Sequence, residues 1–136
     1  MNRYLLIVFA VLTLSGCKKT QQTACGTQVC TDLFASVGVH YFDQNNYPVV
    51  VKDFKVMDLR TRQVISHVTP ANSVPSNYME VVDDNDKEDL STEGDNVQVS
   101  ATDPTTNQNK AVVLKIAGGC NCHVTKLSGP DTIRFN

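Results

Sequence analysis

LFASVGVHYF, residues 33–42, is the stretch that decides the fold. Alternate positions of this stretch carry Leu33, Ala35, Val37, Val39 and Tyr41. A period of two is that of a β-strand, because successive side chains point to opposite faces of a sheet. The stretch therefore predicts a strand with one face in a hydrophobic core, and residues 43–46 follow it as a polar turn.

Seven further segments have the composition of short strands. They are residues 49–59, 64–68, 78–82, 97–101, 110–117, 120–127 and 132–135. Polar turns separate them, and no stretch after residue 17 has the 3.6-residue apolar period of a helix. We therefore predict an all-β fold, an antiparallel β-sandwich of seven or eight short strands that forms one domain over residues 25–136.

The N-terminus has a different pattern. Arg3 precedes an apolar segment, residues 4–14, whose eleven residues would span about 16 Å as a helix, roughly half of a hydrocarbon core. This length is typical of a signal peptide and too short for a transmembrane helix. Leu14-Ser15-Gly16-Cys17 then resembles the lipobox of bacterial lipoproteins. A buried core helix would not explain why Ser-Gly-Cys follows so closely.

The lipobox resemblance implies a processed and lipid-modified N-terminus. We expect a cleaved signal peptide over residues 1–16, a covalent lipid on Cys17, and a lipidated, flexible tether over residues 17–24. The partner of this N-terminus would be the lipid bilayer, and the protein would lie in the cell envelope. Lys18 stands where an aspartate is associated with inner-membrane retention, so the outer membrane is favoured.

Charge and composition restrict the partners of the remaining chain. Of the 12 basic residues only Arg3 precedes Cys17, which leaves 11 basic against 14 acidic residues and a net charge of −3. The sequence has no basic stripe, so we expect no nucleic-acid partner. It also has no tryptophan, which disfavours an aromatic stacking platform for sugars.

Four cysteines remain after Cys17: Cys25, Cys30, Cys120 and Cys122. An even number in an oxidising compartment indicates disulfides, and their spacings differ from the Cys-x2-Cys pairs of metal sites. A bridge within Cys-x-Cys on an extended strand needs Cα atoms about 6.5–7 Å apart, at the limit of disulfide geometry. We therefore expect Cys25 and Cys30 each to pair with Cys120 or Cys122. Strict antiparallel alignment would join Cys30 to Cys120 and Cys25 to Cys122.

The densest polar loop is an acidic run, residues 83–89. Its carboxylates, hard oxygen donors of the kind that bind calcium, belong to Asp83, Asp84, Asp86, Glu88 and Asp89. The order of an EF-hand is absent, because position 6 of the run is Glu88 instead of Gly and position 12 is Gly94 instead of Glu. We therefore expect a solvated hairpin tip without specific calcium binding, and no cofactor apart from the lipid on Cys17.

The sequence shows no catalytic motif. His40, His67 and His123 lie on separate predicted strands, and no nucleophile stands at a characteristic spacing from a base. There is no G-x-S-x-G motif and no phosphate-binding glycine loop. We expect a non-catalytic interaction or structural domain whose partner is an envelope protein or a glycan. The alternatives are a binding module for a small ligand, a glycan or calcium, and a small hydrolase or inhibitor without a recognisable site.

Several short motifs resemble those of a group of small lipoproteins common in the Bacteroidota. They are Cys30-Thr31 before an alternating strand, Asp43 and Pro48 after it, and Cys122-His123-Val124-x-Lys126-x-Ser128-Gly129-Pro130 near the end. The resemblance covers most of residues 25–136. It implies an immunoglobulin-like or transthyretin-like sandwich, similar to carboxypeptidase regulatory-like domains, in the cell envelope. It also implies a Cys30–Cys122 bridge, which leaves Cys25 for Cys120, and it supplies no catalytic residue.

Overall fold

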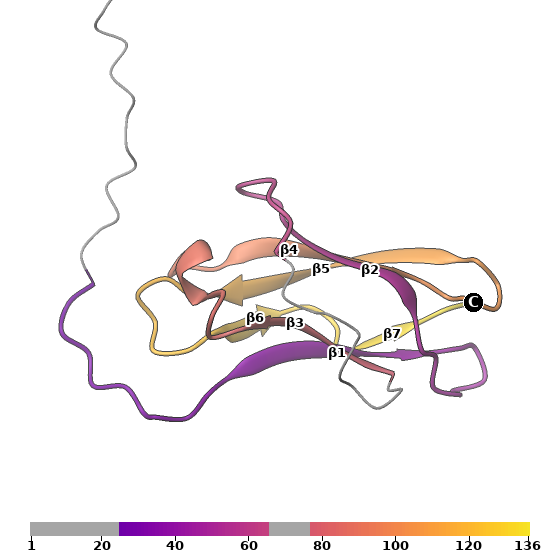
Figure 1. Ribbon diagram of the computed structural model, residues 1–136, viewed down its shortest axis with the longest axis horizontal. Helices are drawn as coiled ribbons and strands as arrows, with labels where there is room; N and C mark the ends of the chain where they lie inside the picture. The colour runs from indigo at the N-terminus through magenta and orange to yellow at the C-terminus, as the bar shows by residue number, and fades with distance from the viewer. Residues whose placement is uncertain (1–24, 66–76) are drawn as a thin grey trace, which may run out of the picture.

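The computed structural model describes residues 25–65 and 77–136, and this part of the chain is a two-layer β-sandwich (Figure 1). One sheet has the order β3-β1-β7, and the other has the order β2-β4-β5-β6. The strands are β1 (Ser36–Phe42), β2 (Lys52–Asp58), β3 (Tyr78–Asp83), β4 (Asp95–Thr102), β5 (Asn109–Ala117), β6 (Thr125–Ser128) and β7 (Thr132–Arg134). A short 3-10 turn, η2 (Lys87–Asp89), precedes β4. The predicted all-β sandwich is confirmed.

The strand pairs are antiparallel except for one. β7 runs parallel to β1, with Tyr41 opposite Ile133. The chain leaves β6 in one sheet and turns at residues 129–131 into β7 in the other sheet, where it takes the free side of β1. This parallel pair is a departure from the fully antiparallel sandwich that the sequence predicted.

The core lies between the two sheets and follows the alternation of β1. Val37, Val39 and Tyr41 are buried, as their period of two predicted, and they belong to one cluster with the inward residues of the opposite sheet. Those residues include Val97, Val99, Ala101, Leu114 and Ile116. Tyr41 stacks on Phe135, with ring centroids 5.8 Å apart, so the end of the chain closes one side of the core.

Three predicted strands are shorter in the structure. Residues 33–35 precede β1, and Leu33 is 75 % exposed. Residues 118–124 form turns and bends before β6, because Gly118 and Gly119 pack closely against the backbone around η2, where a side chain would clash. Residues 49–51 are not in β2, and Pro48 makes only an isolated bridge to Phe42.

Several sequence predictions fall on residues outside the described part of the chain. These are the signal peptide, Cys17 and the tether in residues 1–24, and His67 with the rest of residues 66–68. Of the predicted strand at 64–68, Val64 makes an isolated bridge to Met57. Within residues 25–65 and 77–136, no helix combines the length and the apolarity that a membrane crossing requires.

Candidate functional site

The chain enters the sandwich through an arm without regular secondary structure, residues 25–35, here called the N-terminal arm. Two disulfides join this arm to the turn after β5. Cys25 pairs with Cys120 and Cys30 with Cys122, with Cα–Cα distances of 5.2 and 5.3 Å. The structure therefore has the cross-paired connectivity, in the version that the family resemblance implied. We call the end of the sandwich that carries the arm and this turn the near end (Figure 1).

The reason for cross-pairing differs from the one that the sequence suggested. Cys120 and Cys122 do not lie on an extended strand but in a turn and a bend after Gly118 and Gly119. The turn directs both sulfur atoms at the arm, so each cysteine receives its own partner. The turn is itself fastened to the loop before β4, because the Asn121 side chain donates to the carbonyl of Thr92.

A carboxylate, an imidazole and a hydroxyl form a second connection between the arm and this turn. Asp84 accepts hydrogen bonds from the backbone N–H groups of Ala35 and Val124, each at 2.9 Å, and contacts His123 Nδ1 at 2.8 Å. The other ring nitrogen of His123 lies 2.9 Å from the hydroxyl of Thr31. Sequence reasoning missed this connection, although Thr31 adjoins Cys30 and His123 adjoins Cys122.

The pKa of Asp84 fixes the hydrogen-bonding roles in this connection. Partial burial alone would raise the pKa, but the hydrogen bonds from Ala35, His123 and Val124 lower it below the ordinary value. Asp84 is therefore an acceptor at neutral pH, and Nδ1 of His123 carries the donated hydrogen. In the neutral imidazole, Nε2 then accepts from the Thr31 hydroxyl. The order hydroxyl–imidazole–carboxylate is also that of acyl-transfer triads.

The other carboxylates of the acidic run bond mainly to their own loop. Asp86 is buried and accepts from the backbone N–H of Asp83, and Asp83 accepts from the backbone N–H of Asn85. Glu88 and Asp89 belong to η2, and the carbonyl of Asp89 accepts from Arg60.

In the described ranges, no group of three or more His, Cys, Asp or Glu side chains is arranged to hold a metal ion. The absence of specific calcium binding stays a prediction.

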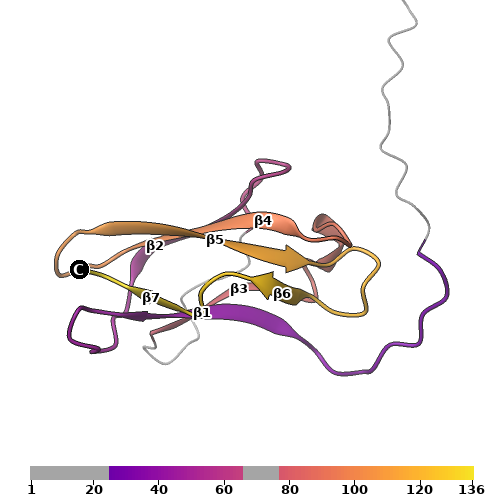
Figure 2. The same ribbon diagram turned by 180° about the vertical axis from the view of Figure 1, so that it is seen from behind.

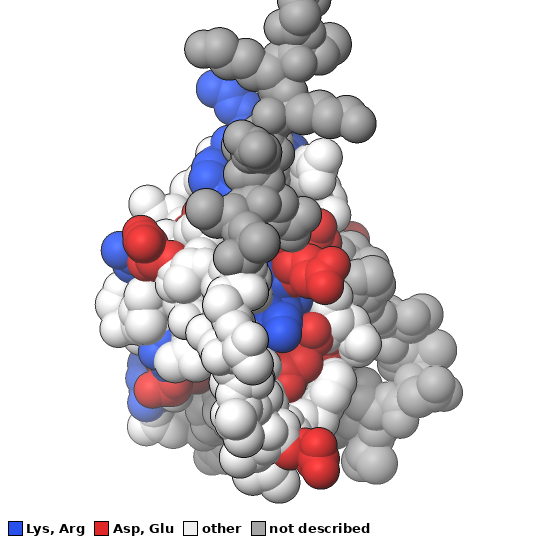
Figure 3. Space-filling view, turned by 90° about the vertical axis from the view of Figure 1, so that its left-hand side faces the viewer, with Lys and Arg blue, Asp and Glu red and all other residues white. Residues whose placement is uncertain are grey.

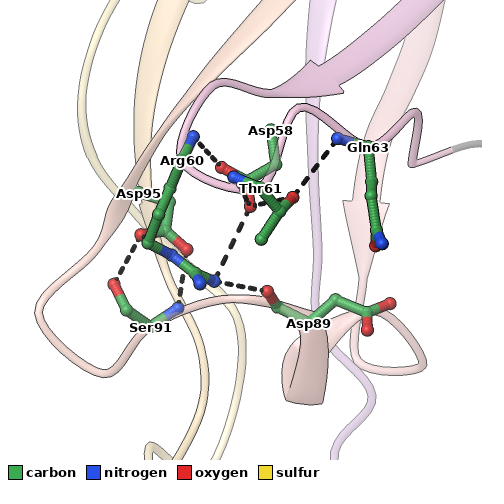
Figure 4. Close-up of polar contacts among 7 residues, drawn as sticks. All are labelled: Asp58, Arg60, Thr61, Gln63, Asp89, Ser91 and Asp95. Carbon is green, nitrogen blue, oxygen red and sulfur yellow. Dashed lines mark hydrogen bonds and ion pairs between the residues drawn. The ribbon is translucent and has the colours of Figure 1, made fainter. Parts of the chain in front are cut away.

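A second polar cluster joins the turn after β2 to the loop before β4 (Figure 4). Arg60 donates from Nε to Asp95 at 2.8 Å and from its terminal nitrogen to the carbonyl of Asp89. Asp95 also accepts from the N–H and the hydroxyl of Ser91, each at 2.8 Å.

Asp58 accepts from the N–H of Arg60 and the hydroxyl of Thr61. Asp58 and Asp95 are almost fully buried, so these bonds replace water and hold the two loops together.

The opposite end of the sandwich, here called the far end, contains a cavity of about 350 Å³. The loop after β1, the loop between β4 and β5, and the last two residues line it. Its lining is mixed, with the apolar Val49 and Phe135 beside Asp43 and Asp103. Bonds from the Thr106 hydroxyl and the Thr105 N–H hold the pKa of the buried Asp103 below its usual range. Figure 2 shows that this end, marked by the C-terminus, lies opposite the arm.

The histidines do not form a group in the described structure. His40 lies in β1 and contacts the rings of Tyr78 and Phe42, with centroids 5.0 and 6.5 Å away. His123 belongs to the near-end connection, and His67 lies outside the described residues.

Comparison of the chain with protein-family models, with curated proteins and with solved structures found no match. The likeness to small envelope lipoproteins therefore stays a prediction carried by the short motifs given above. The features available for assigning a function are the doubly bridged arm, the polar connection beside it and the cavity at the far end.

We predict that Asp95→Asn destabilises the protein in a pH-dependent way. Burial alone would raise the pKa of Asp95, but hydrogen bonds from Arg60 and Ser91 lower it. The stabilisation by ionised Asp95 is therefore present above the unfolded pKa of about 3.9 and is lost as the pH falls through the lower folded pKa. Urea denaturation should show a loss of about 1.5–3 kcal/mol at pH 7, the range for hydrogen bonds to charged groups.

The same measurement below pH 3 should show a smaller difference between Asp95→Asn and the wild type. Glu93→Gln is the matched control, because Glu93 is an exposed acidic residue of the same loop. It should change the free energy of unfolding little at either pH. A difference for Asp95→Asn that is equal at both pH values would contradict this assignment.

Proposed function

We propose that this chain is a lipid-anchored domain of the bacterial cell envelope, favoured at the outer membrane, that acts by non-catalytic interaction. The observation that carries the proposal is the double bridge at the near end, where the chain arrives from Cys17 and the tether. The lipobox-like Leu14-Ser15-Gly16-Cys17 supports the anchor. Two acyl chains on that cysteine would make release from a bilayer negligible.

The bridges suit an anchored domain for a mechanical reason. A pull on the tether reaches Cys25 and Cys30 and passes through sulfur directly to the turn that follows β5. The hydrogen bonds of β1 are thereby relieved of that force. Noncovalent attachment through the Asp84 connection alone would rest on a few hydrogen bonds, each contributing about 1 kcal/mol.

On this proposal the anchor attaches at the near end, which leaves the far end free to point away from the membrane. β5 runs from Asn109 beside the far-end loop to Ala117 beside the bridged turn. Its nine residues span about 27 Å, so the loop between β4 and β5 lies about that far from the bridged turn. We infer that these loops face the partner, and that the partner is an envelope protein.

The polar connection at the near end supports a structural role better than a catalytic one. The Asp84 carboxylate is occupied by two backbone N–H groups, one from the arm and one from the residue before β6. The far-end cavity does not include Thr31, and the second surface hollow, around Arg60 and Lys115, does not include it either. We therefore propose that Thr31 and His123 fasten the arm.

A second candidate function, the binding of a small ligand or a glycan, is favoured by the far-end cavity. Its volume of about 350 Å³ is at the lower end of the range for ligand sites. Apolar side chains with a few convergent acceptors, here Asp43 and Asp103, are the usual composition of such sites.

We predict that the mature protein begins at an acylated Cys17. Mass spectrometry of the membrane fraction should find an N-terminal peptide that starts at Cys17 and carries lipid, and Cys17→Ser should leave the protein without this modification. Cys25→Ser is the control for loss of a cysteine, and it should retain the lipid. A wild-type protein with an intact residue 1–16 segment and no lipid would overturn the proposed anchor.

We predict that the far end contacts the partner in intact cells. A photoreactive side chain at Tyr47, which is 68 % exposed in the far-end loop, should give one discrete adduct. The matched position is Val113, which is 44 % exposed in the middle of β5 and should give none. A protease-sensitive adduct supports the protein partner, and a glycosidase-sensitive adduct supports the second candidate. An adduct from Val113 alone, or from neither position, would refute a far-end contact.

A further inference from the structure

The N-terminal arm exposes large apolar side chains that the fold leaves uncovered. Val29 is 99 % exposed, Leu33 75 % and Phe34 64 %. These three residues lie within six positions of a segment whose only charged residue is Asp32. Figure 3, which faces the near end, shows a largely uncharged strip with acidic and basic side chains beside it.

Folding alone does not account for this exposure. The arm has no strand partner, and its bridges at Cys25 and Cys30 hold it along the surface. Of the other exposed large apolar side chains, Tyr47 and Val50 share the far-end loop, and Leu59, Val64, Val113 and Leu127 are spread over several elements. Single exposed apolar residues are ordinary, whereas a group of them marks a surface that something covers.

The chain that leads to the arm identifies what covers it. If Cys17 is anchored as proposed above, seven residues, 18–24, separate it from the arm at Cys25, and they reach at most about 25 Å. The arm is then the described segment closest to the bilayer along the chain. A connection of so few residues would also keep it at an effective concentration on the order of millimolar relative to that surface, so a weak contact is sufficient.

We propose that Val29, Leu33 and Phe34 contact the bilayer interface directly and dock the near end of the domain on the membrane. This inference rests on the proposed lipid anchor and extends it from a tether to a fixed orientation. The contact is apolar, because Asp32 lies in the arm and the Asp84 carboxylate accepts from Ala35 at its end. The arm itself therefore offers no positive charge to anionic lipid.

The absence of tryptophan from the chain permits a direct test. Phe34→Trp and Tyr47→Trp each place a single reporter at an exposed aromatic position, at the near and the far end, with the native residues 64 % and 68 % exposed. The mature, lipidated proteins, which begin at Cys17, are reconstituted in phosphatidylcholine vesicles with or without brominated acyl chains. Phe34→Trp should lose emission in the brominated vesicles and shift to shorter wavelength, and Tyr47→Trp should do neither.

Two further variants test the apolar nature of the contact. Leu33→Asp added to Phe34→Trp should restore the emission, whereas Val64→Asp, at an exposed position outside the arm, should leave the quenching unchanged. Replacing part of the phosphatidylcholine by phosphatidylglycerol should not increase the quenching. An increase would assign the contact to the basic Lys18-Lys19 tether and would overturn the proposal.

The outcomes separate the docking from the anchor. Protein that floats with the vesicles but shows no quenching at Phe34→Trp, or equal quenching at both positions, overturns the docking and leaves the anchor intact. A shift to shorter wavelength without quenching means that another molecule or segment covers the arm, which also overturns it. Protein that fails to float refutes the anchor, and the docking with it.

Discussion

The two disulfides between the N-terminal arm and the turn after β5 are the constraint on which the remaining structure depends. They join residues 95 and 92 positions apart, so they close the described domain into one covalent loop. In the chain-entropy model, closing a loop of this length stabilises the folded state by about 4–5 kcal/mol. Once Cys25 and Cys120 are joined, the Cys30–Cys122 bridge closes only a short ring made of residues 25–30 and 120–122. It therefore adds less to global stability and mainly fixes the direction of the arm.

Buried carboxylates hold the loops of this small sandwich in place by hydrogen bonds. Asp58, Asp95 and Asp103 are buried, and each accepts hydrogen bonds from backbone N–H groups and hydroxyls of a neighbouring turn. A turn that leaves a strand has N–H groups without ladder partners, and a buried carboxylate can accept from such an N–H and from a nearby side chain at once. Asp84 does this for the arm itself, which connects the covalent bridges to the sheet that contains β1.

Sequence patterns predicted the strands whose side chains alternate, and they failed where alternation continued beyond a strand. β1 and β4 were found with a shift of a few residues, because burial of one face imposes the period of two. Leu33 and Cys122 also continue an alternating pattern, yet the arm and the Gly118-Gly119 turn place them outside strands. The parallel direction of β7 was not predictable, because side-chain periodicity carries no information on strand direction. Links such as Thr31–His123–Asp84 join distant positions and leave no local motif.

Connectivity of the cysteines is the most direct test of this account, because the attachment of the arm to the turn after β5 depends on it. Protein taken from the cell envelope is alkylated without reduction, digested, and its bridged peptides are sequenced by mass spectrometry. The account predicts one doubly bridged species, in which the peptide with Cys25 and Cys30 is joined to the peptide with Cys120 and Cys122, and fragmentation should assign Cys25 to Cys120 and Cys30 to Cys122. A single peptide with an intact Cys120–Cys122 bridge, or four alkylated free thiols, would contradict it.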